Sequence, residues 1–478
     1  MSDKHTLEIN QLFDTVVKGG YCIGCGACAS VSGAQVRMRL DKCGRYYPYI
    51  SKEVNSSNFD VGPIAVCPFA ENNVTEDEIS KELFSKDKDC KYNSSIGYYL
   101  GTYAGFVRED NFRENGSSGG MVSWILCEIV KRHIVDAIVH VHPHKPVAGD
   151  HRLFKYQISN SISDVLKGAK SHYYSVEMSE VINTIRHTTQ TYAIVGVPCF
   201  IKAIRLLARE DEKIRDNVKF CIGLTCGHLK SARFADMFAW QCDVAPRNLV
   251  SIDFRVKLPN HDANNYGIQV TGLQNGHEVQ CTKMNREFYG YLWGYGFFKY
   301  NACDYCDDVF AETADISFGD AWLEQYLKDY KGTNIVIIRN KLFQNLIKQG
   351  ISQGRLHLND IGANEVAKSQ DAGLRHRRQG LSYRLYLKDQ AGQWRPPKRV
   401  GPGCEHINNK LRKIFVLREK MAEESHLAFD EALNKGNFNL FKKRMDKLLR
   451  KYNSLYGRTL RKRVSSGVKR LVKKVFSK

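Results

Sequence analysis

The stretch Cys22-Ile-Gly-Cys-Gly-Ala-Cys28, followed at a distance by Val66-Cys67-Pro68, decides how the first part of this chain folds. A C-x2-C-x2-C run with a distant Cys-Pro is the spacing with which a chain surrounds a cubane iron–sulfur cluster. Gly24 and Gly26 let the backbone turn tightly between the thiols, because glycine accepts positive φ and has no Cβ. A zinc site is the alternative, although zinc usually takes two Cys pairs. We therefore expect one 4Fe-4S cluster, with the ligands Cys22, Cys25, Cys28 and Cys67.

A second set of thiols lies further along the chain: Cys199, Cys226 and the pair Cys303/Cys306. Cys199 and Cys226 follow expected strands, so all four thiols could meet at one edge of a sheet. The spacing alone leaves zinc, a redox pair and chance open. Cys199 also precedes an expected helix, whose N-terminus would lower its pKa and suit a nucleophile or redox thiol. Cys221 competes with Cys226 as the ligand.

Bulk composition indicates a soluble globular protein. The 478 residues favour two or three domains, and the chain is 43% hydrophobic and 26% charged. No apolar run approaches the roughly 18–20 residues of a membrane span, and the first residues carry no signal sequence. We therefore expect a cytoplasmic protein. In that setting 15 cysteines favour metal or redox chemistry over disulfides, with the remaining thiols, Cys43 among them, as small core residues.

The net charge of +20 is concentrated near the C-terminus. Residues 405–478 hold 21 Lys and Arg against 7 Asp and Glu. Apolar residues at helical spacing from about Leu411 predict one or two amphipathic helices with basic faces, and the segment 458–478 continues this pattern. Packing within the protein or against a subunit is one role, and peripheral contact with anionic lipid at the inner face of the membrane is another. Nucleic acid is not expected as a partner, because no nucleic-acid module is present.

Between about residues 97 and 340, short apolar strands alternate with helical patterns. Strands are expected at 135–141, 193–197, 218–224, 315–318 and 334–338, and helices at 121–132, 201–209 and 232–240. This alternation predicts an α/β body with a largely buried mixed sheet.

The run Asn115-Gly-Ser-Ser-Gly-Gly120 stands directly before one of these helices. Small residues there let backbone N–H groups approach an anion, and the helix dipole adds attraction. Arg113 and Lys170 could contact a phosphate, although a plain helix cap and an exposed lysine explain them equally simply. Neither a Walker motif nor a dinucleotide fingerprint is present.

Two carboxylates, Asp315 and Asp320, lie on an expected strand and at its exit. They could hydrogen-bond a cofactor or guide protons, or Asp320 could cap the next helix. We expect His140, His142, His144 and His228 to be structural or exposed.

Together these motifs resemble the beta-subunit family of coenzyme F420 (deazaflavin) hydrogenases and dehydrogenases, over about residues 15–350. The resemblance rests on the two thiol sets, Gly116–Gly120, Gly-Ala-Lys170, Cys226-Gly-His and the segment 314–322. It implies FAD as cofactor and a second 4Fe-4S cluster on Cys199, Cys226, Cys303 and Cys306. It also makes the loop a flavin phosphate site, with the candidates Arg113, Ser117, Ser118, Gly119, Gly120 and Lys170.

We therefore expect an α/β (mixed α+β) protein with a ferredoxin-like unit (1–95), a flavin- and cluster-binding body (96–370) and a basic helical extension (371–478). The expected function is an oxidoreductase that passes electrons between ferredoxin or another carrier and an unknown organic acceptor. The alternative is a non-catalytic electron-transfer subunit that docks to a larger enzyme, and related chains occur beside surface-polysaccharide genes. The sequence assigns no catalytic residue and no acceptor.

Overall fold

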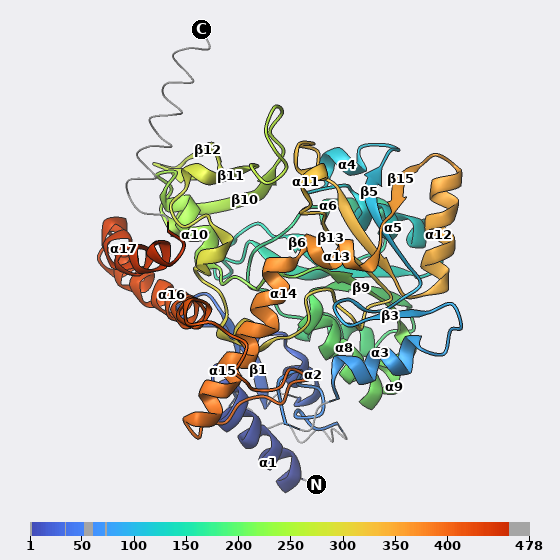
Figure 1. Cartoon of the computed structure of the whole chain (residues 1–478), viewed down its shortest axis with the longest axis horizontal. Coiled ribbons are helices and arrows are strands. Elements are labelled where there is room, and N and C mark those ends of the chain that lie inside the picture. Colours follow the sequence, from blue (N-terminus) through green and yellow to red (C-terminus); the bar gives the residue numbers. More distant parts are fainter. Residues whose placement is uncertain (1, 34, 52–60, 72–73, 458–478) are drawn as a thin grey trace.

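The computed structural model describes residues 2–33, 35–51, 61–71 and 74–457. Its centre is an eight-stranded mixed sheet with the strand order β15-β5-β14-β13-β9-β8-β6-β7 (Figure 1). The four inner strands are parallel: β6 (Ala137–Pro143), β8 (Tyr192–Gly196), β9 (Val218–Leu224) and β13 (Ile316–Asp320). The outer strands run antiparallel to their neighbours: β5 (Gly101–Val107), β7 (Phe154–Ser159), β14 (Asn334–Ile338) and β15 (Leu356–Asp360). The expected mixed α/β body is confirmed.

Helices cover both faces of this sheet, so its inner strands are buried on both sides. Along β8, Ala193 and Val195 face the cluster that contains α5 (Met121–Lys131) and α12 (Lys341–Ser352). Tyr192 and Ile194 face the opposite cluster, which contains α7 (Ser179–Arg186) and α8 (Pro198–Glu210). Helix α8 begins before the expected residue 201, because Pro198 suits the first helical position.

The N-terminal segment packs against the α8 side of the sheet. It contains α1 (Ser2–Leu12), α2 (Ala27–Val31), the hairpin of β1 (Val36–Leu40) and β2 (Tyr46–Ile50), and α3 (Glu76–Phe84). One apolar cluster joins Ile9 of this segment, Ala137 of the sheet and Leu381 of α15 (Gln379–Gln390). The buried core therefore crosses both expected boundaries, 95/96 and 370/371, and that division stays a prediction.

A second, antiparallel sheet of β10 (Leu249–Val256), β11 (Gly267–Gln274) and β12 (His277–Met284) lies beside the main body with α10 (Arg233–Trp240). The helices α16 (Asn409–Asn434) and α17 (Phe438–Leu455) pack against this unit (Figure 1). The predicted C-terminal amphipathic helices are confirmed up to residue 455, and their apolar faces are covered by the protein itself. The expected segment 458–478 lies outside the described residues. None of the described helices is long and apolar enough to cross a membrane.

Candidate functional site

The thiols of the first set line one cavity. Cys25 and Cys28 are buried, Cys22 and Cys67 are partly exposed, and the remaining wall is mainly apolar. The backbone N–H of Gly24 donates to Cys22 Sγ at 3.3 Å, a contact that would stabilise a thiolate. Cys43 is buried but does not line this cavity.

The two glycines between these thiols adopt the predicted left-handed conformation. The φ angles are +70° at Gly24 and +85° at Gly26. A Cβ on Gly24 would lie 2.6 Å from the carbonyl oxygen of Tyr46, and a Cβ on Gly26 would lie 2.8 Å from the backbone nitrogen of Ser179. Both positions therefore require glycine for conformation and for space.

The second set of thiols lines another cavity, although its members come from three places in the fold. Cys199 lies in the first turn of α8, Cys226 follows β9, and Cys303 and Cys306 belong to the tight turn around Asn301–Tyr305. The backbone N–H of Leu229 donates to Cys303 Sγ at 3.2 Å. Cys221 is buried within β9 and does not line the cavity.

Burial keeps these thiols protonated in the protein without metal. It raises the pKa of Cys22 and of Cys226 to about 12 and the pKa of Cys303 to about 11. The pKa of Cys199 is also raised, mainly by burial, so the helix N-terminus does not activate this thiol as a nucleophile. Metal binding would replace these protons. Within the described ranges, no three Cys, His, Asp or Glu side chains meet closely enough for a single metal ion.

A larger pocket of about 270 Å³ lies at the carboxyl ends of β8, β9 and β13. This edge is where ligands bind in open α/β sheets. The Ser/Gly loop before α5 forms one wall and the segment Gly168–Tyr174 forms another. Of the residues predicted to bind a cofactor, four line this pocket: Ser117, Ser118, Gly120 and Lys170.

Hydrogen bonds and close packing hold the Ser/Gly loop in place. Ser117 Oγ accepts the backbone N–H of Ser171 at 2.8 Å, and Ser118 Oγ donates to the carbonyl of Thr333 at 3.0 Å. Gly120, with φ at +83°, precedes α5. Gly119 is absent from the pocket lining, because it packs where a Cβ would lie 2.6 Å from the carbonyl oxygen of Gly105.

The two predicted phosphate contacts differ in placement. Arg113 is buried behind the loop and does not line the pocket; its guanidinium donates to the carbonyl of Gly332 at 2.8 Å and to Asp329 at 2.6 Å. Lys170 lines the pocket, and its Nζ donates to Asp253 at 2.9 Å.

The end of β10 brings two cations to the loop that we did not predict. Arg255 pairs with Asp320 at 2.9 Å and donates to the carbonyl of Ser117 at 3.2 Å, and Lys257 Nζ donates to the carbonyl of Ser118 at 2.9 Å. Burial lowers the pKa of Lys257 to about 7, and the charge of Arg113 lowers it further. Asp320 thus orients an arginine rather than capping a helix.

Asp315, the other carboxylate of that strand, has a structural role. It accepts the backbone N–H of Cys221 at 2.8 Å and pairs with Arg205 at 2.8 Å. It is buried and does not line the pocket.

Two buried histidines line the pocket in the neutral form. His228 stacks on Trp293 with a centroid distance of 4.3 Å, and His172 stacks on Phe154 at 4.3 Å. Burial lowers the pKa of His172 to about 4 and holds the pKa of His228 well below its usual value. The Nε2 atoms of both rings are buried without a hydrogen-bond partner in the described part of the chain. Each ring can therefore hydrogen-bond a ligand.

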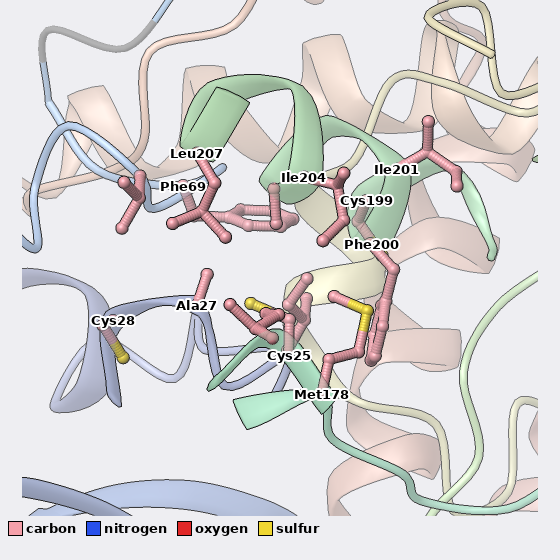
Figure 2. Packing of buried hydrophobic residues seen from close by; sticks show 14 of the residues in the cluster. Cys25, Ala27, Cys28, Phe69, Met178, Cys199, Phe200, Ile201, Ile204 and Leu207 are labelled. Carbon is pink, nitrogen blue, oxygen red and sulfur yellow. The ribbon is translucent and has the colours of Figure 1, made fainter. Parts of the chain in front are cut away.

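The three cavities adjoin one another. Ile23 and Phe69 line both thiol cavities, and Cys226 and Leu229 line both the second thiol cavity and the large pocket. Figure 2 shows Phe69 and Cys25 facing the helix that carries Cys199, within one apolar cluster.

Two family models match the chain. Residues 102–183 match the N-terminal domain, and residues 189–364 match the C-terminal domain, of the coenzyme F420 hydrogenase/dehydrogenase beta subunit. Together they cover more than half of the sequence. The chain belongs to this family. Its members are oxidoreductase subunits, so the predicted family and its general redox function are confirmed.

Among solved structures, the chain is similar to one described as the F420-reducing [NiFe] hydrogenase complex from Methanosarcina barkeri, a xenon derivative. The alignment has 14% identity and a TM-score of 0.48, and it covers 64% of this chain and 99% of the other. No curated protein matches the chain.

Proposed function

We propose that this family member is an iron–sulfur flavoprotein oxidoreductase that passes electrons between a one-electron carrier, such as ferredoxin, and an organic acceptor. The observation that carries the proposal is the row of three adjoining cavities, two lined by four thiols each and one by the Ser/Gly loop. Four buried thiols around one space fit a 4Fe-4S cluster. The proposed ligands are those named above, in two sets of four.

The large pocket fits FAD in its donor set. Ser117, Ser118 and Lys170 line it, and Arg255 and Lys257 add positive charge behind the loop, so this wall would hold the phosphates. Bound FAD would exchange single electrons with the clusters and transfer two-electron hydride equivalents to the acceptor.

Neutral His228 and His172 would orient the ring system or the acceptor, because their free Nε2 atoms belong to pocket-lining rings. Apolar side chains such as Val195 and Phe318 exclude water from the same space. The proposed setting remains cytoplasmic, with contact to a membrane or subunit through the basic C-terminal segment as a further proposal.

Anaerobic purification with joint quantification of iron, sulfide and flavin tests this proposal. Two cubane clusters and one flavin predict about eight irons, about eight sulfides and about one FAD per chain. A colourless protein that contains zinc would reject it.

The family description favours a second candidate, because it describes beta subunits. In this candidate the chain transfers electrons for a larger enzyme, for instance in surface-polysaccharide synthesis, and has no substrate of its own. Stable co-purification with a catalytic subunit, together with reduction of an artificial dye but of no organic acceptor, would support it.

A further inference from the structure

Arg377, at the end of α14 (Asp371–Arg377), is the one cationic side chain that lines the second thiol cavity. The residue lies beyond the part of the chain matched by the family models. Only 1% of its surface is exposed, so the guanidinium is held among the thiols without contact with water.

Half of this guanidinium is anchored by the protein. Its Nη2 atom donates to the carbonyl of Gly227 at 2.9 Å and to the carbonyl of Cys226 at 3.3 Å, and it lies 4.0 Å from Cys226 Sγ. The Nε and Nη1 atoms are buried and have no hydrogen-bond partner in the described part of the chain. Buried donors are normally satisfied, so these two atoms indicate a missing acceptor.

The charge on Arg377 also lacks a carboxylate partner among the described residues. Its electrostatic partners are the four thiols Cys306, Cys226, Cys303 and Cys199. A buried cation normally requires a paired anion. A 4Fe-4S cluster with four thiolates is an anion, and its sulfur atoms accept hydrogen bonds.

Neighbouring residues fix the position of Arg377. His376 Nε2 lies 2.7 Å from the carboxylate of Asp304, which stands between Cys303 and Cys306. Lys299 and Arg384 also contact Asp304, at 2.5 Å to its carboxylate and 2.9 Å to its carbonyl. These contacts join the C-terminal extension to the loop that carries two of the thiols.

We propose that Arg377 donates hydrogen bonds to the sulfur atoms of a cluster in the second cavity and raises its reduction potential. The inference rests on the proposed function and assigns a role in it to the C-terminal extension. Reduction adds negative charge to the cluster, and a fixed cation with N–H donors stabilises the reduced form more than the oxidised form.

The test is a potentiometric titration of the anaerobic holoprotein, followed by EPR, for the parent and for three variants. Arg377→Met should keep its iron, and the midpoint of one cluster should shift to more negative potential while the other stays in place. Arg377→Lys should give a smaller shift in the same direction, because it keeps the charge and loses the planar donors. Arg378→Met is the matched control. The Arg378 side chain is 29% exposed and contacts Ser94 and Glu312, so both midpoints should stay in place.

Full iron content with unchanged midpoints in Arg377→Met would overturn the inference and leave the proposed function standing. If Arg377→Met fails to keep the cluster, Arg377→Lys decides: an unchanged midpoint there refutes the inference. Absence of iron–sulfur signals from the parent would instead reject the proposed function.

Discussion

Gly26 shows at the scale of one residue how the backbone surrounds the first thiol set. Its φ of +85° and the 2.8 Å approach of the Ser179 nitrogen leave no room for a side chain. Gly149 has nearly the same φ, +84°, but no atom lies within 4 Å of an added Cβ. The pair therefore separates conformational strain from steric clash.

We predict that Gly149→Ala costs about 1 kcal/mol, the penalty for a left-handed alanine, and leaves the iron content unchanged. Gly26→Ala should cost about 1–3 kcal/mol more, because backbone atoms must move, and should lose iron from the first site. Chemical denaturation and iron analysis measure both effects. Equal losses of stability in the two variants would contradict the steric account.

Lys257 gives a pH-dependent prediction. Burial, with Arg113 and Lys170 nearby, lowers its pKa from 10.5 to about 7, so the side chain is charged below pH 7 and neutral above it. A bound phosphate favours the charged form. Flavin affinity should therefore fall by up to about tenfold per pH unit as the pH rises above 7.

Flavin release measured from pH 6 to pH 9 checks this dependence. Lys257→Arg should bind flavin with little change over that range, because arginine stays charged. Lys257→Met should bind weakly throughout. A parent profile identical to that of Lys257→Arg would count against a phosphate contact at Lys257.

Sequence spacing was sufficient to find the thiols and the Ser/Gly loop, because consecutive residues at fixed intervals carry those patterns. Arg255, Lys257 and Arg377 were missed because single cations have no local signature. Their roles depend on the β10 strand end and the α14 end reaching sites formed by distant segments. Arg113 shows the reverse case: it is near the loop in sequence, but its guanidinium points to Asp329 and Gly332.

At the scale of elements, β9 separates two neighbouring cysteines. Cys221 lies within the strand, while Cys226 follows its end and lines the second thiol cavity. We predict that Cys226→Ser loses about four of eight irons, and that Cys221→Ser keeps them all. Iron analysis after anaerobic purification gives the result. Iron loss in Cys221→Ser with retention in Cys226→Ser would reverse the ligand assignment.

Helix α17 belongs to the core of the second unit. Phe441 is fully buried, with ring centroids 5.4 Å from Phe429 and 5.7 Å from Phe298. Phe441→Ala should destabilise the protein by about 3–5 kcal/mol, whereas Lys443→Ala on the exposed face should change stability by about 0.5 kcal/mol or less. Denaturant titration compares the two. A neutral Phe441→Ala variant would mean that α17 is not an integral part of this core.

The parallel strands were predictable because each is a short, wholly apolar run between helices. The antiparallel sheet β10-β11-β12 was not predicted, because its strands alternate with polar residues and its register depends on the neighbours α10, α16 and α17. The C-terminal helices were visible in the 3.6-residue period of their apolar side chains, but the surface they cover was not.

At the scale of the whole molecule, the N-terminal segment, the sheet and the C-terminal extension share one apolar cluster. That shared packing places the first thiol cavity against the second, with Ile23 and Phe69 in both walls, and places the second against the large pocket through Cys226 and Leu229. Separate domains joined by mobile linkers would not fix such distances. The central claim is therefore that this chain holds two neighbouring clusters beside a flavin.

EPR spectroscopy of the fully reduced, anaerobically purified protein tests this claim most directly. Two reduced clusters in adjoining cavities should interact magnetically and give a broadened spectrum. In Cys226→Ser this spectrum should simplify to that of one isolated cluster. A parent spectrum that already shows a single isolated cluster, or no iron–sulfur signal, would contradict the account.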